Sequence, residues 1–204
     1  MTTYATLKSD IAGWLLRDDL TSAIPSFIRL CESALRRDLR IRQMLKTYTM
    51  TLTDQSMALP SDFLDMERIT LDSDSEWLLT YQPPSVLYSS DAYRDTGTPA
   101  YYTIEGNYLI TAPPPTDSPD ALLSYYRGYD ELSDDADTNW LLTNAYDVYL
   151  YGSLAHASPY IKEDERVQVW VAGYSSAIAA LKKRDKQGTF GSGTLSRQMP
   201  GSAP

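Results

Sequence analysis

Apolar side chains recur at helical spacing twice near the start of the chain. The first set predicts a helix over residues 7–17 with Thr6 as its N-cap, and it comprises Leu7, Ile11, Trp14 and Leu15. The second set predicts a helix from about residue 22 to Arg40 with Pro25 in its first turn. Its stripe comprises Ile24, Phe27, Ile28, Cys31, Leu35 and Leu39.

The opposite face of this second helix is strongly basic. It carries Arg29, Arg36, Arg37 and Arg40. Two interpretations fit these arginines: a contact with an acidic partner, or an ordinary solvated helix surface. We therefore treat the four arginines as a candidate interface.

At Thr47 the pattern changes from helical to alternating, which is typical of half-buried strands. The run 47–53 and the short return 57–59 predict a hairpin, and residues 66–71 and 77–81 predict further strands. A second hairpin is predicted around Gly106 and Asn107, because both residues tolerate a positive φ and two aromatic, β-branched runs flank them. Residues 121–126 predict the last strand, and the charged segment 130–137 predicts a linker.

Helical spacing returns in the last third of the chain. Thr143 is expected to cap a third helix that Pro159 closes near residue 158. A fourth helix is predicted over residues 163–184, with acids first and bases last as the helix dipole favours. Its stripe comprises Val167, Trp170, Val171, Tyr174, Ile178 and Leu181. After Gln187 the chain is rich in Gly, Ser and Pro, which predicts a flexible tail.

Together these elements predict an α+β fold. Amphipathic helices need partners, so the N- and C-terminal helix pairs are expected to form one four-helix bundle with an antiparallel β domain inserted between them. The predicted domains are residues 1–46 with 138–186 for the bundle, residues 47–137 for the β domain, and residues 187–204 for the C-terminal extension.

Composition and charge narrow the class of protein. The chain of 204 residues is 43% hydrophobic and 22% charged, and no apolar run is long enough to predict a membrane span. The net charge of -9 is segmental: residues 54–147 hold eighteen acidic and three basic residues, whereas both flanks are basic. This distribution argues against sequence-specific nucleic-acid binding. The acidic middle fits either a solvated surface or a wall that repels DNA.

No residue pattern predicts catalysis. His156 is the only histidine, and the single cysteine, Cys31, falls in an apolar stripe typical of a core. The pairs Asp134 with Asp135 and Glu163 with Glu165 are candidate glycosidase carboxylates, but acids at a helix start already have a dipole explanation. No phosphate-binding loop, dinucleotide turn or metal motif occurs. We expect neither an enzyme nor a cofactor or metal.

Several stretches, in this order and spacing, resemble one known family. They are residues 24–40, Leu59-Pro60-Ser61-Asp62-Phe63-Leu64, Gly97-Thr98-Pro99-Ala100-Tyr101-Tyr102, Ala112-Pro113-Pro114, Tyr125-Tyr126, Asn139-Trp140-Leu141-Leu142 and residues 160–170. The chain is similar over about residues 20–185 to the head-to-tail adaptor, or connector, proteins of tailed phages. The match rests on order and spacing, since none of these stretches is a chemical signature.

The resemblance implies a virion protein made in the host cytoplasm. It would form a ring of 12 copies beneath the portal, join capsid to tail, and line the channel through which DNA passes. Its partners would be the portal protein, a tail or nozzle protein and further copies of itself, without a membrane. The C-terminal extension would enter the portal, with Phe190, Leu195, Arg197 and Met199 as contact residues.

Two alternatives remain open from the sequence. One is an accessory peptidoglycan-degrading hydrolase of the virion, which predicts a carboxylate of raised pKa in a cleft. The other is a tail-completion or tail-tube ring protein, which differs from an adaptor in the neighbour that it binds.

Overall fold

The computed structural model describes residues 2–17, 19–71, 77–160 and 165–190. The chain divides into two compact units: residues 1–42 with 129–204, here called the helical unit, and residues 43–128, called the β unit. The described residues contain six α-helices and two four-stranded sheets, so the α+β class is confirmed. Residues 129–137, which the sequence predicts as the end of an inserted domain, belong to the helical unit by their contacts.

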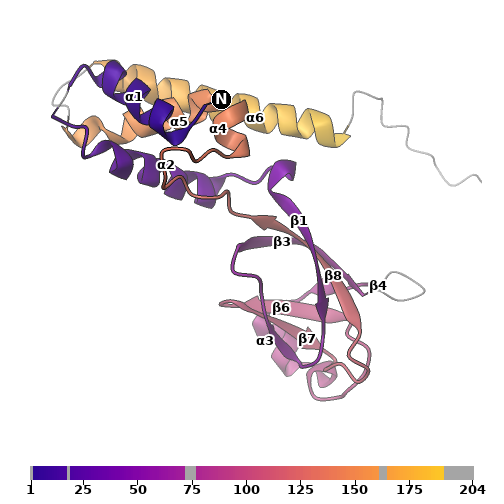
Figure 1. The fold of residues 1–204 in the computed structure, drawn as a ribbon. Coiled ribbons are helices and arrows are strands. Elements are labelled where there is room, and N and C mark those ends of the chain that lie inside the picture. Colours follow the sequence, from indigo (N-terminus) through magenta and orange to yellow (C-terminus); the bar gives the residue numbers. More distant parts are fainter. Residues whose placement is uncertain (1, 18, 72–76, 161–164, 191–204) are drawn as a thin grey trace, which may run out of the picture. The chain divides into compact units, whose positions relative to one another are not determined.

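Five helices make up the helical unit (Figure 1). They are α1 (Tyr4–Leu15), α2 (Ile24–Asp38), α4 (Trp140–Asn144), α5 (Tyr146–His156) and α6 (Arg166–Phe190). Helix α5 is central, since it packs against each of the other four. Gly152 allows the closest approach, because a Cβ at this position would lie 2.5 Å from the Cys31 Sγ of α2 and 2.9 Å from the Tyr174 ring of α6. Cys31 is fully buried, as its place in the apolar stripe predicts.

Several helix ends and caps differ from the predicted ones. The N-cap of α1 is Thr3, whose hydroxyl accepts from the backbone N–H of Thr6, so the prediction of Thr6 as cap is wrong. The predicted third helix is two helices, broken at Ala145, and its N-cap is Asn139 rather than Thr143. Asn139 is the better cap because its side-chain oxygen accepts from Leu142 N at 2.8 Å, whereas the Thr143 hydroxyl donates to a backbone carbonyl within the turn.

Helix α6 ends at Phe190 and thus takes in residues 187–190 of the predicted tail. Contacts with the end of the first helix pair accompany this extension. The backbone N–H of Arg42 donates to Asp185 Oδ1 at 3.0 Å, and the Arg42 side chain also pairs with that carboxylate. Gly188 lies against the Arg42 guanidinium, where a Cβ would collide. The start predicted at Glu163 lies outside the described residues.

The β unit contains two sheets with strand orders β1-β8-β3-β4 and β2-β7-β6-β5. The strands are β1 (Leu45–Thr51), β2 (Ser56–Ala58), β3 (Phe63–Leu71), β4 (Trp77–Leu78), β5 (Thr80–Tyr81), β6 (Tyr101–Glu105), β7 (Tyr108–Ala112) and β8 (Asp120–Arg127). All pairings are antiparallel except β5 with β6. The short helix α3 (Pro84–Ser89) packs against β6.

Of the two predicted hairpins, one is confirmed and one is wrong. Strands β6 and β7 pair around Gly106, whose φ is +58°, as the turn residues predict. Strand β1 does not pair with β2: it pairs along its length with β8, while β2 joins β7 in the other sheet. The hydrophobic core explains why these strands belong to different sheets. Met50, Leu52 and Leu59 are buried in one core that residues of both sheets form together.

Candidate assembly interface

The basic face of α2 is present, but its four arginines do not act alike. Arg29, Arg36 and Arg37 are exposed, and Arg40 is partly buried. Arg36 pairs with Glu131 at 3.1 Å, while Arg40 donates to the carbonyls of Arg36 and Leu39 at the end of the helix. A cationic side chain is stabilised at that position, because the last carbonyls of a helix lack intrahelical donors. Arg29 and Arg37 donate to Ser26 and Ser33 of their own helix, so these two are the better candidates for a partner.

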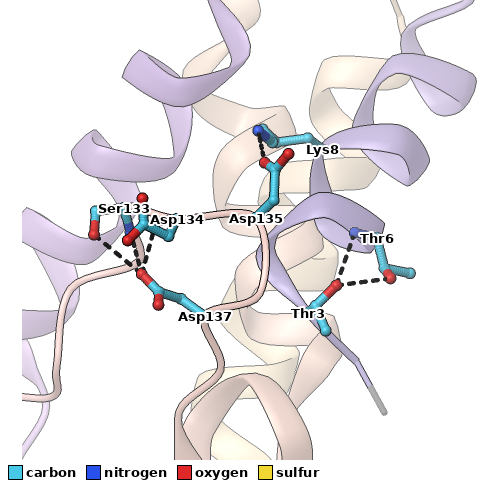
Figure 2. Close-up of polar contacts among 7 residues, drawn as sticks. All are labelled: Thr3, Thr6, Lys8, Ser133, Asp134, Asp135 and Asp137. Carbon is cyan, nitrogen blue, oxygen red and sulfur yellow. Dashed lines mark hydrogen bonds and ion pairs between the residues drawn. The ribbon is translucent and has the colours of Figure 1, made fainter.

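The segment predicted as a linker is fastened to α1, as Figure 2 shows. Tyr4 N donates to the Asp137 carbonyl at 2.9 Å and Ala5 N to the Asp135 carbonyl at 3.2 Å. These are N–H groups of the first turn of α1, which has no intrahelical acceptors for them. The Asp135 carboxylate pairs with Lys8 of the same helix and raises the pKa of that lysine. The acidic loop therefore completes the start of α1.

Asp137 organises the loop from within (Figure 2). Its carboxylate accepts from Asp134 N at 2.7 Å, from Ser133 N at 2.8 Å and from the Ser133 hydroxyl at 3.0 Å. These hydrogen bonds lower the pKa of Asp137, the Asp134 N–H foremost. Asp137 thus has a structural function that its sequence context alone, a run of charges, does not indicate.

A half-buried network ties the same loop to α2 and α5. Glu32 accepts from Leu132 N at 3.1 Å and from the Tyr149 hydroxyl at 3.2 Å. Asn139 donates to that hydroxyl at 2.9 Å and to the Asp130 carbonyl at 3.0 Å. Burial raises the pKa of Glu32 in spite of these donors, and it also raises the pKa of Tyr149. The sequence does not indicate this network, because its members come from three separate segments.

The β unit has an unbalanced charge. Residues 43–128 include twelve acidic and four basic residues, so the bases cannot neutralise the acids. Lys46 and Asp62 form an ion pair at 2.8 Å, and the Tyr125 hydroxyl donates to Asp62 at 2.7 Å. Burial opposes ionisation of Asp62, but the hydrogen bonds from Lys46 and Tyr125 hold its pKa below the ordinary value. The remaining surplus of acids gives the unit a net negative surface.

The β unit also has a hollow of about 620 Å³ between its two sheets. Strand β3 contributes residues 63–66, and Tyr81, Tyr102, Ile104, Gly106 and Asn107 form the other side. Phe63, Met66 and Ile104 are partly buried and pack against the core. The hollow was not predicted, because it exists only where strands distant in sequence meet.

The structure places only part of the predicted portal-binding set. Phe190 is the last residue of α6, whereas Leu195, Arg197 and Met199 lie outside the described residues. The function of these four residues therefore stays a prediction.

The candidate catalytic residues that the structure describes do not form a site. Asp135 is 76% exposed and paired with Lys8, and Glu163 lies outside the described residues. Burial raises the pKa of Cys31 to about 12. Burial and nearby Arg37 lower the pKa of His156. Within the described part of the chain, no three His, Cys, Asp or Glu side chains gather as a group that could hold a metal ion. No helix there is long and apolar enough to cross a membrane.

Comparison with known proteins identifies the family. No curated protein sequence matches the chain. The family model described as SU10 adaptor protein matches residues 2–198, which is nearly the whole chain and includes both units. This match agrees with the resemblance to phage head-to-tail adaptors that the helix, turn and strand stretches of the sequence indicate. The chain therefore belongs to the SU10 adaptor protein family, a family of structural phage proteins.

Proposed function

We propose that this chain is a ring-forming head-to-tail adaptor that joins the portal of a tailed phage to its tail and lines the DNA exit channel. The family match over residues 2–198 carries this proposal. A structural function also agrees with the position of the candidate glycosidase carboxylates, since those that the structure describes, Asp134, Asp135 and Glu165, are exposed. The ring would contain 12 copies, as the resemblance implies. It would be made in the host cytoplasm and reside at the head–tail junction of the virion.

The two compact units correspond in this proposal to two domains with separate functions. The helical unit would be a bundle in which α1, α2, α5 and α6 are the four principal helices and α4 is a short addition. The packing of α5 against the other helices supports such a bundle. Arg29 and Arg37 on its surface are candidates for the contact with an acidic neighbour.

The β unit would face the channel with part of its acidic surface. Its surplus of eight acidic residues supports this assignment. A duplex repelled by the wall does not form the phosphate contacts that would hold it, so it can slide through. A tail or nozzle protein would bind the ring on the side away from the portal.

The C-terminal extension would attach the ring to the portal. Phe190, Leu195 and Met199 would supply apolar anchors and Arg197 a cation for an acidic portal surface. Helix α6 continues to Phe190 and so includes the first four residues of the extension, which supports this arrangement.

Reconstitution with the portal protein tests the proposal. The full chain should form a ring on the portal, whereas a variant ending at Phe190 should bind at least about a hundredfold more weakly, since several anchors are lost. A quadruple variant with Ala at the four contact residues is the matched control for chain length. Equal ring formation by all three proteins would refute the assigned portal contact, and failure of the full chain to bind any portal would refute the adaptor function.

A further inference from the structure

One face of α6 is left uncovered by the rest of the helical unit. The buried residues of this helix include Trp170, Ala177 and Leu181, which face α5. The opposite side shows a second set of exposed residues spaced alternately four and three apart, which starts with Glu165 in the turn just before the helix and continues with Val169, Ala172, Ser176, Ala179 and Lys183. Between residues 167 and 181 α6 has no charged residue. An alternating four-three spacing is the pattern of a helix that packs lengthwise against another helix.

An apolar groove continues this face at the start of α6. It has a volume of about 430 Å³ and is lined by Gly13, Trp14, Leu16, Arg166, Val169 and Trp170. Leu16 is 81% exposed with a φ of +54°, a conformation that leucine seldom adopts, and Val169 is 66% exposed. Arg166 donates to the Trp14 carbonyl and lies over the Trp170 ring, so it forms part of the groove wall. Large exposed apolar side chains gathered in this way are typical of an interaction surface.

The charges at the two ends of the face indicate which partner fits. Glu165 begins the exposed set and Lys183 ends it, with Arg184 and Lys186 beyond. A second copy of α6 laid antiparallel would place its Lys183 beside Glu165, and the same pair would recur at the other end. A parallel second copy would instead set like charges against each other, which is unfavourable.

We propose that two copies of this chain pair through antiparallel α6 helices. In the register that aligns Glu165 with Lys183 of the second copy, Val169 meets Ala179 and Ala172 meets Ser176. These small side chains let the two helices approach closely, and the groove beside Val169 receives the end of the second α6. The contact is twofold and closes with two copies, so it cannot by itself build a ring.

The pairing would therefore be a form of the free subunit. It would keep the apolar face covered until the portal is met, and the dimer would separate as subunits join the ring. This last step rests on the proposed adaptor function, whereas the dimer itself does not.

Cysteine pairing tests the orientation. We would mix equal amounts of the full-length variants Ala172→Cys and Ser176→Cys under mild oxidation, because a disulfide forms only across a Cα separation of about 4.4–6.8 Å. Antiparallel pairing predicts the mixed disulfide, with little product from either variant alone. Cys31 does not interfere, since it is fully buried. Disulfides in each single variant would indicate a parallel pair and overturn the proposal, as would the absence of any disulfide.

Sedimentation velocity over a range of concentrations tests the face and its charges. Val169→Glu should raise the dimer Kd about a hundredfold or more, because it buries unpaired charges. The matched control is Val171→Glu, which adds the same charge at an exposed position off the face and should leave the Kd within about twofold. Lys183→Glu should raise the Kd about tenfold, and adding Glu165→Lys should restore it.

The outcomes separate this inference from the adaptor function. A wild-type protein that stays monomeric, or an equal effect of the two valine substitutions, would refute the dimer. If Val169→Glu still forms a ring on the portal, the proposed adaptor function stands whether or not the dimer is refuted.

Discussion

The helical unit and the β unit differ in how they use their charges. In the helical unit, ion pairs hold separate segments together: Lys8 with Asp135, Arg36 with Glu131, and Arg42 with Asp185. In the β unit the acids outnumber the bases three to one, and the core between the sheets stabilises the fold instead. Charged side chains of the helical unit therefore mainly stabilise its fold. The surplus acidic residues of the β unit have too few basic residues in that unit to pair with, so their negative charge acts on the surroundings of the protein.

Substitution of Gly152 should give the largest loss, confined to the helical unit. In Gly152→Val the new side chain would collide with Cys31 and Tyr174, and we expect a destabilisation of about 3 kcal/mol or more. The measurement is the free energy of unfolding from urea denaturation.

Gly13→Ala is the matched control for this prediction. A Cβ at Gly13, also inside a helix, meets nothing within 4 Å. This substitution should stabilise the protein by up to about 1 kcal/mol, because alanine is the better helix former. Tolerance of Val at position 152 would show that the three helices do not meet at Gly152.

Loss of the Asn139 side chain should have the next largest effect. Asn139→Ala removes the N-cap of α4 and a hydrogen-bond partner of the buried Tyr149 hydroxyl, and we expect a cost of about 2–3 kcal/mol. Hydrogen exchange should show faster exchange of Leu132 N–H and Leu142 N–H.

Thr143→Ala separates the two cap assignments. Thr143 is the cap that the sequence predicts, and in the structure its substitution should cost much less than that of Asn139. The reverse order of the two effects would contradict the network described here.

Glu32 and Asp62 should contribute to the pH dependence of stability with opposite signs, because their pKa values are shifted in opposite directions. The pKa of Glu32 is raised by burial, so the folded protein binds a proton that the unfolded chain has lost. Its contribution is full below the ordinary pKa of 4.5 and is lost as the pH rises through the higher folded pKa. The pKa of Asp62 is lowered, so its contribution is present above the ordinary value of 3.8 and is lost as the pH falls below it.

Two neutral variants measure these contributions one at a time. Glu32→Gln should remove the decline of stability above pH 4.5, and Asp62→Asn should reduce the decline on acidification. Each effect is expected to be smaller than that of Asn139→Ala. The measurement is the free energy of unfolding across the pH range, and identical pH profiles for wild type and Glu32→Gln would contradict the assigned burial.

Local signals in the sequence predicted much of the fold. The stripe of α2, the Gly106 hairpin and the core position of Cys31 follow from spacing or turn chemistry within a few residues. Pairings between strands that are distant in the sequence were not predictable in this way. Strand β1 pairs with β8, which lies about 70–80 residues further along the chain, and nothing within residues 45–59 indicates that pairing.

The candidate interface was less predictable than the fold. The four arginines on one face are alike in the sequence, but only the structure shows that Arg36 pairs with Glu131 and that Arg40 donates to the last carbonyls of the helix. The acidic loop lacks periodicity and so predicted a linker, yet its carbonyls and the Asp135 carboxylate bind α1, and its Leu132 N–H donates to Glu32 of α2. Contacts of this kind use backbone groups that every sequence shares, so a sequence pattern cannot indicate them.

The most direct test of the adaptor function is a cryo-electron microscopy map of the phage particle that contains this protein. Our account predicts a ring of this chain between portal and tail, with acidic residues of the β unit along the channel and the segment after Phe190 in contact with the portal. A map that places the chain away from the head–tail junction, or a channel lined mainly by its lysines and arginines, would contradict the account.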